Sequence, residues 1–455
     1  MSQSFESAAS SGLTDARPET VQSGAAIQRW IGPSLALLIV VAMAFNPIEV
    51  KTSAEFDRAT QSLGFLTLSK LGISGFAAVA AALGLLLDAR TRRLLMSVPG
   101  SLLVFLGVIF VLTSVFANKE FATISRASAI LYLVYLALTA TGLSVLGCRK
   151  MILAIVAGAV CYLLLTWFLF ILVPEKGRFQ EYVSATETVT RMGGTGHPNN
   201  IAKMAITVGL MSTSLIFGRR DPPLGVGVGH WLQRGLLVLA ILLAAITLVA
   251  TFSRTATLAG LVALVVMFRD RLYGRGGIVL AVVGSAVVTC LMIVITLANG
   301  NSPVAQKAVG VITKSGDVEE LTSLTGRTAI WEEALGFISQ RPITGWGMDS
   351  AASIMSKRAT GTHNLLLHVG FSAGVLAAIV ILIVLVWSLI FGITSNYEWI
   401  RAVLVYVLIS GLVEDTIIES FAYSLTMLWM MALLAPTLTA LAPQPSTVGA
   451  PAAAG

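Results

Sequence analysis

Residues 374–391 read GVLAAIVILIVLVWSLIF and carry no charged side chain. They form the centre of an apolar segment over 363–392, which is longer than the about 20 residues that a helix needs to cross the ~30 Å hydrocarbon layer of a bilayer. Similar apolar segments recur along the chain, and we expect each to be a membrane-spanning helix. Together with 363–392 they number about twelve: 31–46, 65–87, 99–117, 122–146, 151–173, 200–217, 235–252, 255–268, 277–298, 400–414 and 418–438.

The overall composition supports a membrane protein. The chain of 455 residues is 56% hydrophobic and only 12% charged, whereas a soluble domain carries roughly 25% charged residues. An open sheet edge cannot be satisfied in lipid, so we expect an all-α, polytopic integral membrane protein. Its single transmembrane domain covers 30–440 and includes a large polar loop, at about 299–362, on the side opposite the basic turns. Residues 1–29 and 441–455 are small and polar, which predicts disordered tails.

The basic residues indicate an orientation in the membrane. The net charge of +7 is not gathered into a solvated cluster, so it does not indicate a nucleic-acid partner. Short basic turns alternate with apolar segments, as the positive-inside rule requires when both termini are cytoplasmic. With this orientation the cytoplasmic turns contain Arg90, Arg92, Arg93, Arg149, Lys150, Arg219, Arg220, Arg234, Arg269, Arg271, Arg275 and Arg401.

Four outward elements carry polar residues that a lipid-embedded scaffold would not need. The first is the loop at 174–200, which ends TRMGGTGHPNN. Its glycines and proline predict a preformed turn, and Asn199 or Asn200 could cap the following helix. A simple helix-start turn would explain His197 and the asparagines equally well. It explains Arg191 less well.

The second and third elements each contribute an arginine. Arg254 lies in TFSRTAT at 251–257, where a guanidinium costs roughly 2.5–3.5 kcal/mol at a helix centre and less near an interface. It should therefore either reach outward to water or meet an anion. The second half of the long loop predicts an amphipathic helix that ends at Arg341-Pro342, a lid whose residues mostly pack. Arg327, at the entrance of this helix, is the exception that we consider functional.

The fourth element is THNLLLH at the start of the 363–392 span. His363 falls at the helix start and Asn364 follows it, whereas His368 lies about 140° further around the helix and should face elsewhere. This spacing argues against a zinc pair, and we expect no metal site. Glu414 and Glu419 in the closing hairpin are functional candidates as interfacial carboxylates, although pairing with the arginines is an equally physical role.

These residues resemble a known family. The S-R turn, the G-R-x-x-x-W helix followed by R-P-x-x-G-x-G, and the H-N-x-x-L span start resemble the O-antigen ligase and polysaccharide polymerase family of membrane glycosyltransferases. The G-H-P-N turn is similar to members associated with exopolysaccharide polymerisation. The resemblance covers about 191–390. It implies a metal-independent, cofactor-free enzyme of the bacterial inner membrane with a periplasmic active face, which takes an undecaprenyl-pyrophosphate-linked glycan as donor and a glycan or lipid A-core as acceptor.

The family position and the chemistry together suggest roles. Arginine binds pyrophosphate oxygens through its planar fork, so Arg191 and Arg254, with Arg327 as a third, are candidates for the donor clamp. By family position His363 is the candidate base, and direct displacement at the anomeric carbon would invert its configuration. The remaining candidates for substrate binding are Asn364, His197, Asn199, Glu414 and Glu419.

Two functions other than glycosyl transfer stay open. The chain could be a transporter or flippase of lipid-linked glycan, or a non-catalytic component of a polysaccharide-assembly complex with other proteins. No internal repeat is visible in the sequence, and the polar residues lie on one side, which counts against a transporter. Among the enzymatic alternatives, the G-H-P-N turn favours a polymerase over a lipid A-core ligase or a protein glycosyltransferase.

Overall fold

Helices make up most of the chain in the computed structural model, which describes residues 19–49, 65–182, 188–218, 228–272, 327–355, 361–419 and 421–440. The helices are α1 (Glu19–Phe45), α3 (Phe65–Leu87), α4 (Ala89–Leu95), α5 (Val98–Ser114), α6 (Ala122–Leu172), α7 (Pro174–Gly177), α8 (Pro198–Phe217), α9 (Val228–Thr251), α10 (Arg254–Met267), α11 (Arg269–Leu272), α15 (Arg327–Gln340), α16 (Ala351–Ile354), α17 (Leu365–Thr394), α18 (Glu398–Gly411) and α19 (Ser424–Ala440).

Every predicted span within the described ranges overlaps a helix, although α19 begins only at Ser424, within the predicted span 418–438. The predicted span 277–298 lies outside the described ranges. By length and composition, 5 described helices could cross a membrane, or up to 6 if the bent pair α4 and α5 forms one span. The predicted count of about twelve is therefore not confirmed. Part of the difference lies in α6, which is counted once although Gly147 (φ 73°) breaks its helical backbone between the predicted spans 122–146 and 151–173.

A short β-hairpin accompanies the helices. Strands β1 (Arg178–Tyr182) and β2 (Thr188–Met192) pair antiparallel, with Arg178 opposite Met192. The all-α prediction did not include it. The argument against strands holds only inside hydrocarbon, and this hairpin lies in the polar loop between α6 and α8, where a sheet edge can be hydrated.

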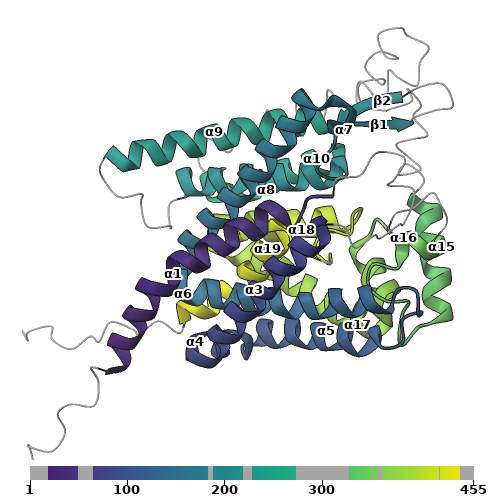
Figure 1. Cartoon of the computed structure of the whole chain (residues 1–455), viewed down its shortest axis with the longest axis horizontal. Helices are drawn as coiled ribbons and strands as arrows, with labels where there is room; N and C mark the ends of the chain where they lie inside the picture. Colours follow the sequence, from purple (N-terminus) through teal and green to yellow (C-terminus); the bar gives the residue numbers. More distant parts are fainter. Residues whose placement is uncertain are drawn as a thin grey trace, which may run out of the picture.

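The polar elements and the basic turns lie at opposite ends of the helix bundle. In Figure 1, β1, β2, α15 and α16 gather at the right-hand end, and α4 lies toward the left. The far ends of α8 and α17 are tied by arginines, since Arg271 donates to the carbonyl of Phe217 and Arg269 donates to that of Ile393. Arg401, at the start of α18, is buried among these helix ends. These three arginines belong to the turns that were predicted to face the cytoplasm.

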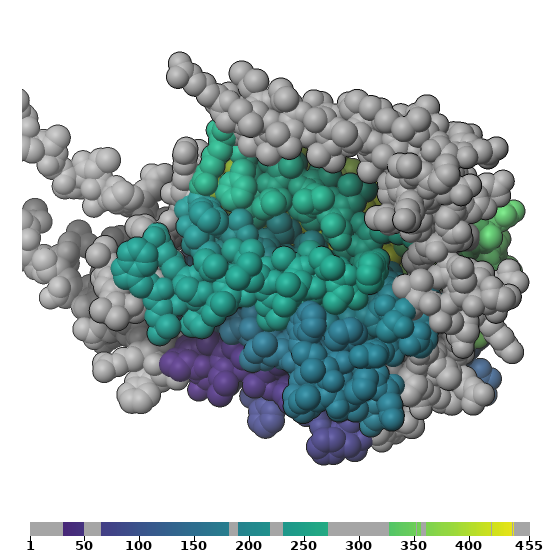
Figure 2. All heavy atoms as spheres, turned by 90° about the horizontal axis from the view of Figure 1, so that it is seen from above, coloured from purple at the N-terminus to yellow at the C-terminus, as the bar shows by residue number. Residues whose placement is uncertain are grey.

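Helices of the bundle differ in how far they are enclosed by protein. Of the apolar stretch of α8, 72% is buried within the protein, whereas only 28% of the apolar stretch of α9 is buried. Figure 2 shows α9 and α10 spread across one face of the molecule, where Leu236, Leu239 and Leu258 are exposed. An apolar helix with an apolar exposed face suits a lipid environment. By contrast, Trp399 of α18 and Trp429 of α19 are fully buried, so the closing helices lie in the interior of the bundle.

Helix α15 confirms the predicted amphipathic helix, and the segment after it docks into a break in α17. The helix ends at Gln340, directly before Arg341-Pro342. At Gly374 the backbone of α17 leaves the helical region (φ 83°), and the N–H of Val375 donates to the carbonyl of Pro342 at 2.7 Å. A Cβ at Gly374 would lie 2.4 Å from the carbonyl oxygen of Ile343. The R-P-x-x-G-x-G segment therefore fixes α15 against α17.

Candidate active site

Arg191 ties three elements together at the polar end of the bundle. From β2, its Nε donates to the carbonyl of Thr251 at 2.7 Å, and its Nη1 pairs with Glu181 of β1 at 2.7 Å. Its Nη2 donates to Oδ1 of Asn199 at 3.0 Å. The side chain is 4% exposed. Arg191 thus joins the hairpin, the end of α9 and the start of α8.

Glu414 is the hub of the site. It lies in the turn between α18 and α19, and its Oε1 accepts from Nδ2 of Asn199 at 3.0 Å and from Nη2 of Arg327 at 2.9 Å. Its Oε2 lies 3.6 Å from Nδ1 of His363. Burial disfavours the charged carboxylate, but His363 and Lys203 outweigh it and lower the pKa of Glu414 below its ordinary value. The structure thus brings Arg191, Asn199, Arg327 and His363 into one connected group.

His363 has a strained backbone and an unsatisfied ring nitrogen. Its φ of 49° lies in the left-handed region, which non-glycine residues rarely adopt except where the surroundings enforce it. Nδ1 makes no hydrogen bond to any described residue. Burial disfavours the imidazolium, but the carboxylates of Glu414 and Asp415 outweigh burial and raise the pKa of His363. A half-buried imidazole whose pKa is raised accepts a proton more readily than an ordinary histidine, which suits a general base.

Asn364 and His197 are helix caps. Oδ1 of Asn364 accepts from the N–H of Leu367 at 3.0 Å, and its Nδ2 donates to the carbonyl of Leu412 at 2.9 Å. At the start of α8, Nδ1 of His197 accepts from the N–H of Asn199 at 3.3 Å. Burial, followed by the charge of Arg191, lowers the pKa of His197 to about 4.

The prediction that Asn199 or Asn200 caps α8 is wrong. Pro198 occupies the first helical position, which suits proline because that position needs no N–H donor, so the cap falls on the preceding His197. Asn199 is thereby released from capping, and its amide can face Arg191 and Glu414 instead.

Glu419 belongs to a second charged group beside Glu414. Its partner is Lys203, which was not predicted from the sequence. Lys203 of α8 is 5% exposed, and its Nζ lies 3.7 Å from Oε1 of Glu419. Burial raises the pKa of Glu419 well above its ordinary value, against the opposing charge of Lys203. A lysine inside an apolar helix is expensive and marks a functional region by default, so the sequence did contain this signal.

His368 and Asp415 extend the site. The sequence spacing predicted that His368 faces away from His363, yet its Nδ1 lies 3.7 Å from Oδ2 of Asp415, the residue next to Glu414. Burial opposes the charge of Asp415, but His368, Lys203 and His363 outweigh burial and lower its pKa to about 2. Neighbouring carboxylates thus face two histidines that lie on different sides of the helix start.

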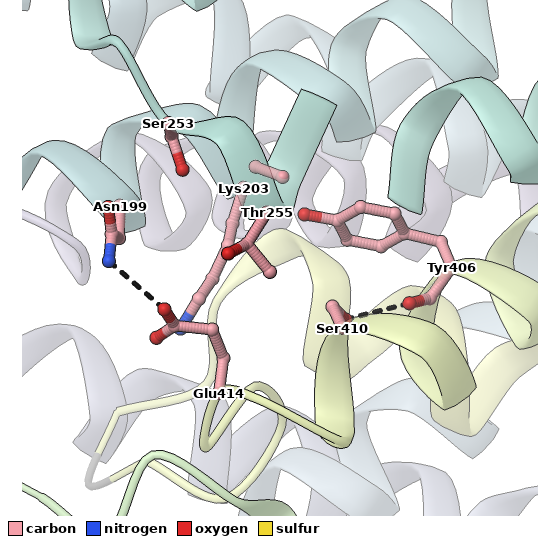
Figure 3. A pocket seen from close by; sticks show the side chains of 8 residues that line it. Asn199, Lys203, Ser253, Thr255, Tyr406, Ser410 and Glu414 are labelled. Atoms are coloured by element: carbon pink, nitrogen blue, oxygen red, sulfur yellow. Dashed lines mark hydrogen bonds between the residues drawn. The ribbon is translucent and has the colours of Figure 1, made fainter. Parts of the chain in front are cut away.

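A small pocket borders Glu414 and reaches the start of α10. Figure 3 shows Lys203 and Asn199 of α8 beside Glu414, with Ser253 and Thr255 contributed by the start of α10. The lining residues are Asn199, Lys203, Ser253, Thr255, Ala256, Tyr406, Ser410 and Glu414.

Arg254 is the first residue of α10, between two residues that line this pocket, and its side chain is exposed. Phe252, two residues earlier, has a left-handed φ of 49°. Among the described residues, left-handed φ at a non-glycine position occurs at Phe252, Asp349 and His363, so two of the three lie at, or two residues from, a position singled out from the sequence for chemistry.

His363, Glu414 and Asp415 could together hold a cation, since one ligand atom of each lies within 4.8 Å of the others. However, Oε1 of Glu414 already accepts from Arg327 and Asn199, which leaves Oε2 for a metal. A guanidinium 2.9 Å from the same carboxylate would repel a divalent ion. The expected absence of a metal site stays a prediction.

Comparison with known proteins gives one family. Residues 239–382 match a family model described as O-antigen ligase, which supports assignment of the chain to that family. The matched region contains Arg254, Arg327 and His363, and ends before Glu414. A search of curated proteins finds no match to the chain.

Proposed function

We propose that this chain, whose residues 239–382 match the O-antigen ligase family model, is a membrane glycosyltransferase. It would transfer or polymerise glycan from an undecaprenyl-pyrophosphate-linked donor at the periplasmic face of the bacterial inner membrane. One observation carries the proposal. Arg327 and His363, both inside the family region, converge on Glu414, beside a pocket at the start of α10.

The arginines divide between ligand binding and positioning. Arg254 is exposed and lies in the chain between Ser253 and Thr255, which line the pocket, so we assign its planar fork to two oxygens of the pyrophosphate. Arg327 holds Glu414 through Nη2 and is the second cation for the leaving group. Arg191 gives three of its nitrogens to protein partners, so we assign it the role of fixing the site around the donor. Preorganised cations of this kind stabilise charge that develops on the leaving phosphate.

His363 removes the proton of the acceptor hydroxyl. Its Nδ1 faces Glu414, so Nε2 is the nitrogen that accepts the proton, and the carboxylate stabilises the resulting imidazolium as in other carboxylate–histidine pairs. The hydroxyl oxygen then attacks the anomeric carbon, the bond to the pyrophosphate oxygen breaks, and the lipid pyrophosphate leaves. Attack opposite the leaving group inverts the anomeric configuration.

The exposed apolar helix faces suit the lipid carrier. A donor on a polyprenyl chain needs a lipid-facing surface next to the cations, and the exposed apolar residues of α10 continue directly from Arg254. The acceptor is a second glycan or a lipid A-core. The G-H-P-N turn favours a glycan acceptor, and hence a polymerase.

The test is turnover by purified protein in detergent or vesicles with a lipid-pyrophosphate glycan donor. We expect products longer than one repeat unit, and none from His363→Ala. Translocation of the donor across vesicles without a new glycosidic bond would instead indicate a transporter. Normal product from His363→Ala would exclude the role that we assign to that residue.

A further inference from the structure

The side-chain amide of Asn199 has only one favourable orientation. Its Oδ1 accepts from the guanidinium of Arg191 at 3.0 Å, and its Nδ2 donates to the carboxylate of Glu414 at 3.0 Å. The flipped amide would place its NH₂ against the guanidinium and its oxygen against the carboxylate. Both contacts would then be repulsive, so the charges on either side fix the amide.

Arg191 is in turn held by the hairpin. Its Nη1 pairs with Glu181, which lies on β1 two residues beyond Phe179, the residue opposite Arg191. Its Nε is fixed by the carbonyl of Thr251. The base of the hairpin is closed by a hydrogen bond from Gly193 to the carbonyl of Gly177 at 2.8 Å. The guanidinium is almost completely buried, so it cannot turn without breaking these contacts.

These contacts give the two carboxylate oxygens of Glu414 different partners. Oε1 receives donors from Asn199 and Arg327, which leaves Oε2 on the side of His363. Without the Asn199 donor, Arg327 alone would hold Oε1, and the carboxylate could rotate away from the imidazole. A base that must be oriented by a carboxylate loses rate when that carboxylate moves, since a displacement of about 1 Å can cost on the order of 100-fold.

We propose that Asn199 is a positioning residue that presents Glu414 to His363, and that Glu181 and Arg191 of the hairpin hold its amide in place. This proposal rests on the proposed function of His363 as the base. It replaces the expectation that Asn199 contacts substrate, because both ends of its amide have protein partners. It also gives a task to Glu181, which sequence reasoning did not single out.

The first experiment separates turnover from binding. Asn199→Asp keeps the shape of the side chain and the acceptor for Arg191, but removes the donor to Glu414. We expect kcat to fall by about 100-fold with little change in the KM for the donor, as for loss of a positioned group. A rise in KM with unchanged kcat would show that Asn199 is a substrate ligand and overturn the proposal.

The second experiment tests the coupling to the hairpin. Glu181→Ala should reduce kcat in the same way and add nothing in an Asn199→Asp background, because both changes break one chain of contacts. Glu181→Gln retains an acceptor for Arg191 and should be close to wild type. Gln180→Ala is the matched control on the same strand. Gln180 is exposed and its Oε1 accepts from Oγ1 of the exposed Thr190, outside the contacts of Arg191, so this variant should leave kcat unchanged. If the losses of kcat from Glu181→Ala and Asn199→Asp were fully additive, the chain of contacts from Glu181 through Arg191 and Asn199 to Glu414 (the relay) would be disproved.

The third experiment does not depend on activity. The chain has 4 histidines, so the ring signals of His363 can be assigned by NMR with labelled histidine and a His363→Ala reference. We expect these signals to shift in Asn199→Asp and Glu181→Ala, and not in Gln180→Ala. If they shift while His363→Ala keeps full activity, the relay exists but the proposed catalytic role of His363 fails. If they do not shift, the relay itself is refuted.

Discussion

His363 combines left-handed backbone, a half-buried ring and two facing carboxylates, and this combination determines its pH behaviour. Since the base acts in its neutral form and its pKa is raised, kcat should fall as the pH drops through a value above the ordinary ~6.5 of histidine. Glu414→Gln removes one of the charges that raise the pKa and should move this fall to lower pH. The measurement is the pH profile of kcat for both proteins. An unchanged profile in Glu414→Gln would argue against the pairing of Glu414 with His363.

Activity should depend on arginine at position 254, and lysine should not replace it, if Arg254 binds pyrophosphate through two nitrogens. Arg254→Lys keeps the charge but loses the planar fork, so we expect at least a tenfold loss of kcat/KM, equal to about 1.4 kcal/mol of transition-state stabilisation. Turnover with a lipid-pyrophosphate donor gives the value. Lys119→Arg, at a position with no place in the site, serves as the matched control. Full activity of Arg254→Lys would mean that a point charge is sufficient.

At the scale of elements, the join between α15 and α17 depends on Gly374. Alanine there would have to adopt φ 83° and place its Cβ 2.4 Å from the carbonyl oxygen of Ile343. We expect Gly374→Ala to destabilise the protein by more than about 1 kcal/mol and to lower activity, because α15 carries Arg327. Gly336→Ala in α15 is the control, since a Cβ at that position meets nothing within 4 Å. Thermal unfolding in detergent compares the two, and equal melting temperatures would disprove the role of the break.

The elements show what could be predicted from the sequence. Apolar runs gave the helices, since hydrophobicity over about 20 residues is a strong signal, and Arg341-Pro342 correctly ended α15. The hairpin was missed because strands of five residues with a mixed pattern carry little periodicity. The break at Gly374 was missed because a single glycine in an apolar run does not reveal that another segment docks there.

The sequence predicted most residues of the candidate site, but few of the contacts between them. Residue type selected Arg327 and Glu414, family position selected His363, and the structure connects the three. Their arrangement depends on tertiary packing, so the sequence could not show that Arg191 is occupied by three partners. Lys203 was not predicted, although a charged residue within an apolar helix is itself a signal; its partner, Glu419, is distant in the sequence.

For the whole molecule, the charges around Glu414 bear on metal dependence. We expect activity to survive EDTA, because the arginines supply the positive charge that a divalent cation provides elsewhere. Turnover after chelation and dialysis is the measurement. Loss of activity that Mg²⁺, Mn²⁺ or Zn²⁺ restores would instead mean that His363, Glu414 and Asp415 hold an ion.

The break in α17 also sets a depth. From Val375 to Thr394 the helix continues for 20 residues, which at 1.5 Å each gives about 30 Å, the thickness of the hydrocarbon layer. If these 20 residues span the hydrocarbon layer, the first turns of α17 and His363, which precede Gly374, lie outside it. In the proposed reaction, the proton taken from the acceptor would pass to water on that side, and the lipid carrier would bring its head group to the same level. The proposed reaction would therefore need no proton path across the membrane, and the position of Gly374 would set the distance between the lipid tail of the donor and its reacting end.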